Sequence, residues 1–337
     1  MAFSASCALA SVRADLPAFF DPAALVHCER VAARIPEFAR SHYIECRLGG
    51  DRQLDFLSYF DDKRAAAAFS AQPSLFDRSP IWARSLELLN AWAEPSSLLS
   101  RARSVWLEYD GSQLSGEPEA SPSVCLEPDY YARHAGLDSG IDPRAREMTE
   151  ATLALLLPQA RRRAALAAVL RCFDALPTGG SIPYVSVMVA RQPVTVKLYV
   201  ALPRRAALGF LERAAWPGNI ASAEALLASY YQPTYETAYL DLTVTERVES
   251  RLGIAESQFH VGEGRSIGGF LDRVQLAGEF VEEREALKSW SGASLVEIAG
   301  MAALIRRWLD GKAVLMGEEV QYKAYLGFSA RLPPLHG

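Results

Sequence analysis

Two hydrophobic periods alternate along this chain, one typical of helices and one typical of strands. The stretch VTVKLYVALP, residues 194–203, is apolar at every second position, and its other face carries Lys197 and Tyr199. The stretch VQYKAYLGF near the C-terminus repeats this spacing with Lys323 and Tyr325. Because successive strand residues point to opposite faces, both stretches predict strands with one apolar face and one face that carries lysine beside tyrosine.

Strand-like stretches occur in five pairs, and helical stretches separate the pairs. Short connections within the pairs predict antiparallel hairpins. The paired strands are HYIECRLGG with QLDFLSYF, SVWLEYDG with SPSVCLEP, IPYVSVMVARQ with TVKLYVALP, AYLDLTVTE with SRLGIAESQ, and AVLMG with VQYKAYLGFSA. Helical periodicity predicts helices around residues 23–39, 81–102, 145–175, 204–216, 222–231 and 267–309.

Consecutive hairpins with helices between them favour one sheet that has helices on one face. Ten such strands can close on themselves, which leaves no exposed edge. We therefore expect an α+β fold: a single ten-stranded antiparallel barrel of five α-β-β-α units, with a surrounding ring of helices, over residues 21–337. Residues 1–20 are expected to form a flexible N-terminal segment. The alternative is a pair of open α+β domains that meet at LPTGGS, residues 176–181.

The alternation also predicts which side chains line the barrel. If helices cover the outside, the apolar set of each strand faces outward and the other set faces a chamber. A polar, solvated face of open sheets would use the same residue types, but the repeated lysine and tyrosine pairing favours a chamber that binds a ligand. The expected lining is Tyr43, Glu45, Arg47, Trp106, Glu108, Asp110, Cys125, Glu127, Tyr184, Ser186, Met188, Lys197, Tyr199, Tyr239, Asp241, Arg251, Gln321, Lys323 and Tyr325.

Composition narrows the classes of function. The 337 residues are 50% hydrophobic and carry a formal net charge of −5, which argues against a nucleic-acid-binding surface. No apolar run is long enough to indicate a membrane span, and the first residues lack the positive region of a secretory signal. The five cysteines contain no C-x-x-C pair and are expected to be reduced. We expect a cytoplasmic protein with no nucleic-acid or membrane partner and no metal held by a protein motif.

The order of elements, the chain length and the Lys-x-Tyr strands resemble the ABBA-type aromatic prenyltransferases, the PT-barrel superfamily. That family includes the fungal dimethylallyltryptophan synthases, small bacterial phenol prenyltransferases and the cyanobactin peptide prenyltransferases. The stretch WLEYD followed by SPSVCLEPD is similar to the glutamate-bearing strand of the indole-prenylating members and its partner strand. The resemblance implies transfer of a prenyl group from a prenyl diphosphate to an electron-rich aromatic small molecule or peptide inside the barrel.

The resemblance also implies roles for the chamber residues. Prenyl transfer requires cations for the diphosphate, aromatic rings that screen an allyl cation from water, and a base for the acceptor proton. Any Mg²⁺ would accompany the diphosphate. The expected catalytic carboxylates are Glu108 and Asp110; the diphosphate cations are Arg47, Lys197, Arg251 and Lys323; and the aromatic shield is Tyr43, Trp106, Tyr184, Tyr199, Tyr239 and Tyr325.

Three positions depart from the family pattern. Cys125 stands where the indole type would place an arginine, and Gly253 and Ala255 stand where a lysine and a tyrosine would be expected. Two of these departures remove a cation from the diphosphate site, and the third removes a tyrosine. They leave a second interpretation open: a PT-barrel protein with changed or lost chemistry, such as a peptide-binding or peptide-modifying protein of a natural-product pathway.

Overall fold

The computed structural model describes residues 4–16, 22–49, 54–72, 80–110, 122–128, 143–230, 236–257, 270, 281–292, 295–297 and 304–331. Within these ranges, one antiparallel sheet runs in the order β11-β1-β2-β3-β4-β5-β6-β7-β8-β10-β9. A further pairing of β10 with β11 closes ten of the strands into a barrel, and β9 is attached to β10. The strands are β1 (Ser41–Arg47), β2 (Leu54–Phe60), β3 (Val105–Tyr109), β4 (Ser123–Leu126), β5 (Ser181–Met188), β6 (Thr195–Pro203), β7 (Thr237–Val244), β8 (Val248–Ser257), β9 (Leu295–Glu297), β10 (Leu304–Met316) and β11 (Glu319–Arg331).

The closed α+β barrel is therefore confirmed. Two open domains are ruled out, because the sheet continues through the proposed boundary: β4 pairs with β5, whose first residue is Ser181. All five expected hairpins form, as β1–β2, β3–β4, β5–β6, β7–β8 and β10–β11.

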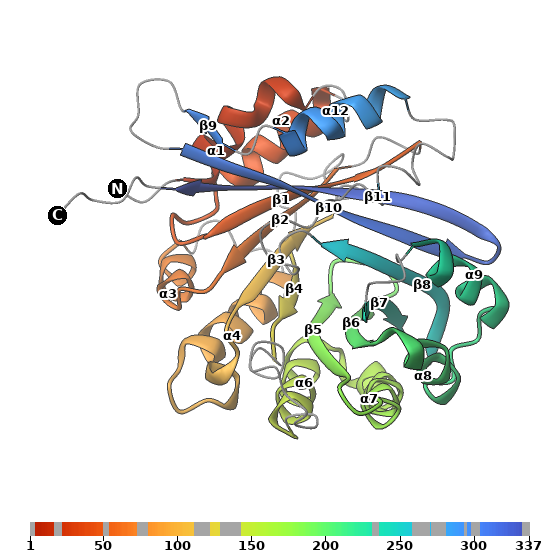
Figure 1. Cartoon of the computed structure of the whole chain (residues 1–337). Coiled ribbons are helices and arrows are strands. Elements are labelled where there is room, and N and C mark those ends of the chain that lie inside the picture. Colours follow the sequence, from red (N-terminus) through yellow and green to blue (C-terminus); the bar gives the residue numbers. More distant parts are fainter. Residues whose placement is uncertain are drawn as a thin grey trace.

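Helices surround the barrel (Figure 1). In that view α4, α6, α7 and α8 lie along one side, and α1, α2 and α12 lie along the opposite side. The stretch expected as one helix over 145–175 is divided into α6 and α7 at Pro158, since proline lacks the amide proton that a continuous helix would use. The described helices are α1 (Ala5–Val12), α2 (Pro22–Ala32), α3 (Arg64–Ser70), α4 (Pro80–Ala93), α6 (Pro143–Leu156), α7 (Gln159–Asp174), α8 (Ala207–Arg213), α9 (Ile220–Tyr230) and α12 (Val281–Gly292).

The apolar core lies between the barrel and the helices. On β6, Val196, Leu198, Val200 and Leu202 are all fully buried on the outward face. The N-terminal segment adds to this layer, because α1 packs against α2 and β11 and buries Leu9. Burying each such aliphatic side chain contributes about 1.5–3 kcal/mol, so this layer holds the opposite, polar face of the strands toward the chamber.

The helices expected over 267–309 are wrong at residues 295–297, which form β9, and at residues 304–309, which begin β10. Residues 304–316 form strand β10, which pairs with β8 on one side and β11 on the other. Apolar residues spaced by four, such as Ile305 and Leu309, read locally as a helix, but hydrogen bonding to two strands decides the outcome. Within the described part of 267–309, only α12 and Phe270 are helical; residues 267–269, 271–280, 293–294 and 298–303 lie outside the described part.

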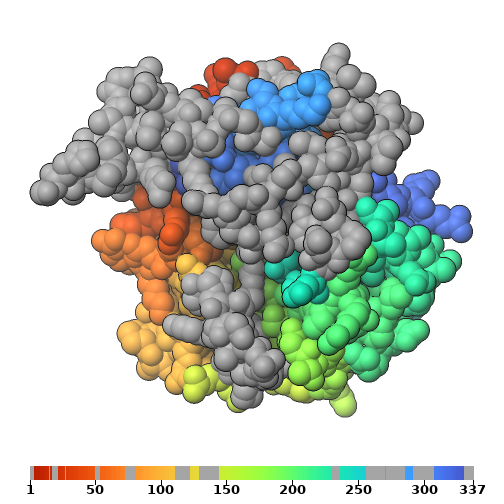
Figure 2. Space-filling view, viewed as in Figure 1, coloured from red at the N-terminus to blue at the C-terminus, as the bar shows by residue number. Residues whose placement is uncertain are grey.

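The long β10–β11 hairpin extends beyond the barrel wall. Figure 2 shows its tip, in blue, projecting beside the green surface that includes α9. Gly317 begins the two-residue turn at the tip with a φ of 68°, a left-handed value that favours glycine. None of the helices in the described ranges is long and apolar enough to cross a bilayer.

Candidate functional site

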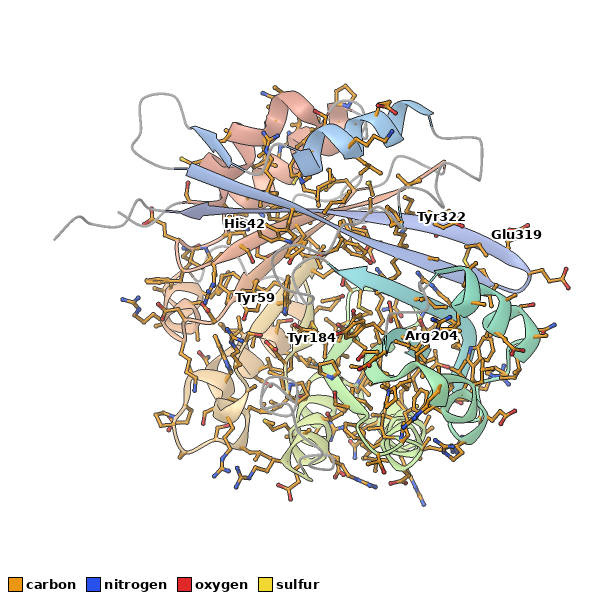
Figure 3. All side chains as sticks on the ribbon, in the orientation of Figure 1. His42, Tyr59, Tyr184, Arg204, Glu319 and Tyr322 are labelled. Atoms are coloured by element: carbon orange, nitrogen blue, oxygen red, sulfur yellow. The ribbon has the colours of Figure 1, made fainter. Side chains whose placement is uncertain are left out.

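The barrel encloses a cavity of about 170 Å³. Tyr59 and Tyr184 lie near the centre of the barrel in Figure 3, whereas Glu319 lies at the far tip of the long hairpin. The cavity is lined by Tyr43, Glu45, Leu57, Trp106, Glu108, Cys125, Tyr184, Ser186, Lys197, Tyr199, Asp241, Ala255, Asp310, Gly311, Lys312 and Tyr325.

Strand register explains why the expected set of side chains meets there. Trp106 is opposite Cys125, Cys125 is opposite Ser186, and Ser186 is opposite Lys197, so one row of inward positions crosses β3 to β6. Since directly opposite residues in an antiparallel pair share a face, the alternation on a single strand sets the lining of its neighbours. Eleven of the expected lining residues lie against the cavity: Tyr43, Glu45, Trp106, Glu108, Cys125, Tyr184, Ser186, Lys197, Tyr199, Asp241 and Tyr325.

The aromatic side chains form a continuous chain of ring contacts. Tyr43 contacts Trp106 at a centroid distance of 5.2 Å, and Trp106 contacts Tyr184 at 6.3 Å. Tyr184 contacts Tyr199 at 5.7 Å, and Tyr199 stacks on Tyr239, also at 5.7 Å. These separations fall in the range at which aromatic pairs attract each other. Five of the six expected shield residues are thereby connected.

The sixth shield residue, Tyr325, contacts a cation. The ammonium of Lys312 lies 5.2 Å from the centroid of its ring. Burial is the largest cause that raises the pKa of Tyr325 and of Tyr43 well above the ordinary tyrosine value. Both phenols are therefore neutral at physiological pH, and they present ring faces and hydroxyl groups rather than negative charge.

Lysines and carboxylates in the chamber form ion pairs. Lys323, which is 4% exposed, contacts Glu45 on β1. Lys197 Nζ is 3.4 Å from Glu108 Oε1, and Lys312 Nζ is 2.6 Å from Asp241 Oδ2. These pairs link β6 to β3, β10 to β7 and β11 to β1, so they bind together strands that are not all neighbours in the sheet.

Arg191, in the turn after β5, adds a second cation beside Glu108. Its Nη2 lies 3.1 Å from Glu108 Oε1, and its Nε contacts Asp110. Glu108 therefore faces both Lys197 and Arg191. Asp110 is 3% exposed, contacts Arg191 and is not among the described residues that line the cavity.

Nearby cations lower the pKa of two carboxyl groups in the chamber. Burial would raise the pKa of Glu45, but Lys323, Lys197 and Lys312 together lower it well below the ordinary value. Asp241 follows the same pattern, with burial opposed by Lys312 and Lys197, and its pKa is lowered. Burial lowers the pKa of Lys323, and nearby Lys197 and Arg251 act in the same direction. The cations of several strands thus face one another.

Gly253 makes room for Lys312, one of the residues that the sequence did not indicate. Lys312 is in register with Ala255 of β8, yet its ammonium reaches across that strand to Asp241 on β7. A Cβ at Gly253 would lie 2.9 Å from Asp241 Cβ and 3.2 Å from Lys312 Cδ. The small residues of β8 therefore leave space that the side chain of Lys312, from the neighbouring strand β10, occupies.

Some expected site residues lie outside the cavity lining of the described chain. Arg47 ends β1 in register with Lys323, and Arg251 lies on β8, where its charge acts on Asp241 and Lys323. Tyr239 joins the site through its stacking on Tyr199. Lys323 is outside the described lining and contacts Glu45, which is part of it. These four are therefore neighbours of the chamber rather than part of its wall.

Several residues in or beside the chamber were not among those expected from the sequence. Asp55 and Leu57 follow the alternation of β2 and could have been found by pairing that strand with β1. Trp308 was missed because the start of β10 was expected to be helical, and Asp310 and Lys312 were missed because they lie between the expected helices and the expected strand AVLMG. Arg191 was missed because the expected strand IPYVSVMVARQ placed it on the outward face, whereas β5 ends at Met188 and Arg191 lies in the turn that follows.

Three acidic side chains come close together beside the cavity. Glu45, Asp55 and Glu108 each have a carboxylate oxygen within 4.8 Å of the others, and all three are buried. Asp55 is directly opposite Glu45 in the β1–β2 register. Because Lys323 already contacts Glu45, and Lys197 and Arg191 contact Glu108, we assign no metal ion to this cluster.

No protein-family model and no curated protein matches this sequence, so its function has to be inferred from the barrel and its chamber.

Proposed function

We propose that this protein is a prenyltransferase of the PT-barrel class, which transfers a prenyl group from a prenyl diphosphate to an aromatic or peptide acceptor inside the barrel. One observation carries the proposal. Four strands each supply one cation, namely Lys197, Arg251, Lys312 and Lys323. The charges of the first three act on Asp241, and those of Lys197 and Arg251 also act on Lys323. These cations lie beside a chamber that is lined by a connected chain of aromatic rings.

The cations are suited to the diphosphate. Each ammonium has three N–H donors, and the contacts of Lys197 and Lys312 with carboxylates leave donors for phosphate oxygens. Hydrogen bonds between charged groups are the strongest available, and they become stronger as negative charge develops on the departing diphosphate. Lys312 supplies the cation that Gly253 lacks.

The aromatic chain is suited to the allyl cation. Each ring face stabilises a nearby cation by about 0.5–2 kcal/mol, and neutral phenols do not trap it as an anion would. The cavity of about 170 Å³ is smaller than the roughly 300–1,000 Å³ of typical drug-sized sites. This volume favours the five-carbon dimethylallyl group over longer prenyl chains.

Glu108 is the proposed base. It lines the cavity, and Lys197 and Arg191 orient its carboxylate. In the reaction, the carbon–oxygen bond to diphosphate breaks with its electron pair on the leaving group. The acceptor atom forms a bond to the allyl carbon, and its proton passes to Glu108. Asp110 takes the role of holding Arg191.

The free thiols of Cys7, Cys28, Cys46, Cys125 and Cys172 suit a cytoplasmic enzyme.

The second candidate is a PT-barrel protein with changed or lost chemistry, such as one that binds or modifies a peptide. Its support is the charge balance of the chamber: Lys197, Lys312 and Lys323 each contact a carboxylate before any diphosphate is present. Cys125 adds to it by occupying the position where a further arginine was expected.

A transfer assay tests the first proposal. The full-length protein is incubated with dimethylallyl diphosphate and a panel of indoles, phenols and aromatic peptides, and prenylated products are detected by mass spectrometry. We expect at least one product, and a rate about 10²-fold lower for Glu108→Gln, because the variant lacks the base. Glu319→Gln, at the exposed hairpin tip, is the matched control and should retain the full rate. Equal product yields from Glu108→Gln and wild type would contradict the assignment of the base.

A further inference from the structure

Asp55 lies in the centre of a buried group of carboxyls. It is directly opposite Glu45 of β1, and Leu57, its neighbour on the same face, is opposite Glu108 of β3. Asp55 and Glu45 are each 2% exposed and Glu108 is 6% exposed. Oxygens of the three carboxyls lie within 4.8 Å of one another, a separation at which two ionised groups repel strongly when little water is present.

Cations neutralise the neighbours of Asp55 directly. Glu45 contacts Lys323 from β11, and Glu108 contacts Lys197 from β6 and Arg191 from the turn after β5. Arg191 also holds Asp110, the fourth carboxyl near Asp55. Each of these three neighbours of Asp55 is thus in contact with a cation, and the charges of all three act on Asp55.

The electrostatics of Asp55 agree with this arrangement. Burial and then the charges of Glu45, Glu108 and Asp110 raise its pKa to about 7, while Lys323 opposes the shift. Arg191 also interacts with the Asp55 charge. Near neutral pH this carboxyl exists in both protonation states, which is the property required of a group that stores and releases a proton.

We propose that Asp55 is the proton store of this site and acts through Glu108. Asp55 is absent from the described cavity lining, so it is a positioning residue rather than a group that touches substrate. This inference rests on the proposed prenyl transfer. The acceptor's proton passes first to the Glu108 carboxylate as the new carbon bond forms and diphosphate departs. It then passes from Glu108 to ionised Asp55, which releases it to solvent and restores both carboxylates.

Infrared difference spectroscopy tests the proposal without relying on turnover. The full-length protein is titrated from about pH 5 to about pH 9, and the carbonyl stretch of neutral carboxylic acids is followed. Wild type should lose one such band with a midpoint near pH 7. Asp55→Asn should lack the band. Asp62→Asn should retain it, because Arg64 lowers the pKa of Asp62 and removes that group from this range.

A second variant decides the matter if Asp55→Asn does not fold. Glu108→Gln removes a negative charge beside Asp55 and should move the midpoint to lower pH. Absence of the band in wild type, its persistence in folded Asp55→Asn, or its loss when Mg²⁺ alone is added would overturn the proposal. Because the band does not depend on catalysis, a protein without transfer activity can still show it. In an active protein, turnover should rise through the same pH midpoint, and Asp55→Asn should flatten that rise.

Discussion

At the scale of single residues, Lys312 supplies a cation beside Gly253, where a lysine was expected from the sequence. The sequence places a glycine where a lysine was expected, and on β8 alone this reads as a lost cation. In the folded barrel, the space left by the missing side chain holds Lys312, which crosses from β10 to Asp241 on β7. A strand read by itself cannot reveal this arrangement, because the lysine comes from a segment about sixty residues away.

Gly253→Ala tests the space requirement. The added Cβ would lie 2.9 Å from Asp241 Cβ, so the Lys312–Asp241 pair has to shift. We expect a loss of about 1–3 kcal/mol in the free energy of unfolding, measured by urea denaturation. Gly209→Ala on α8 is the control; its Cβ meets only the end of the Arg213 side chain, at 3.2 Å, and should not destabilise the protein. Equal effects from the two changes would show that Gly253 holds no special space.

The raised pKa of Asp55 predicts a pH dependence of stability. Folding raises this pKa from an ordinary value near 4 to about 7, so the folded state binds the proton more tightly. The resulting stabilisation is fully present below about pH 4, falls by up to roughly 1.4 kcal/mol per pH unit and is lost as pH rises through about 7. The difference in unfolding free energy between wild type and Asp55→Asn should follow this curve. A difference that stays constant with pH would contradict it.

At the scale of elements, strands were predicted well where both faces have distinct chemistry. On β6 the apolar face is buried under helices and the Lys197 and Tyr199 face lines the chamber, so period two is unambiguous. On β10 the first residues carry apolar side chains at a spacing of four, and this local signal favoured a helix. Pairing with β8 and β11 decides the structure there, and long-range pairing is not visible in a local pattern.

A proline in β10 tests that long-range pairing. Ala313 is in register with Ile254 on one side and Tyr322 on the other. Ala313→Pro removes a ladder hydrogen bond from a strand with neighbours on both sides, and should lower the unfolding free energy by about 3 kcal/mol or more. Glu318→Ala, in the exposed turn of the same hairpin, should change it by less than about 0.5 kcal/mol. A folded Ala313→Pro protein with unchanged stability would be incompatible with β10 as an inner strand.

At the scale of the whole molecule, ring closure makes the chamber. Five hairpins predicted the strand order and most of the lining, because inward and outward sets alternate consistently around a closed barrel. The network of ion pairs could not be predicted, since it joins strands that are distant in sequence, as Glu45 and Lys323 are. Arg191, in the turn after β5, and Lys312, between the expected helices and the expected strand AVLMG, therefore became visible only in three dimensions.

Binding of a prenyl diphosphate is the central claim, and calorimetric titration measures it directly. The non-hydrolysable thiolo analogue of dimethylallyl diphosphate is titrated into wild type, Lys312→Ala, the double variant Lys197→Ala with Lys323→Ala, and Lys288→Ala. Lys288 lies on α12 and pairs with Glu285 at the surface, so it is the matched control.

We predict that wild type and Lys288→Ala bind with the same affinity, that Lys312→Ala binds about tenfold more weakly, and that the double variant loses binding. Lys312→Ala and Lys197→Ala each remove a charged donor to the diphosphate, and Lys323→Ala removes the cation that contacts Glu45 beside the chamber. Equal binding by all four proteins, or no binding by wild type in the presence and absence of the acceptor panel, would contradict the account and favour a barrel with other chemistry.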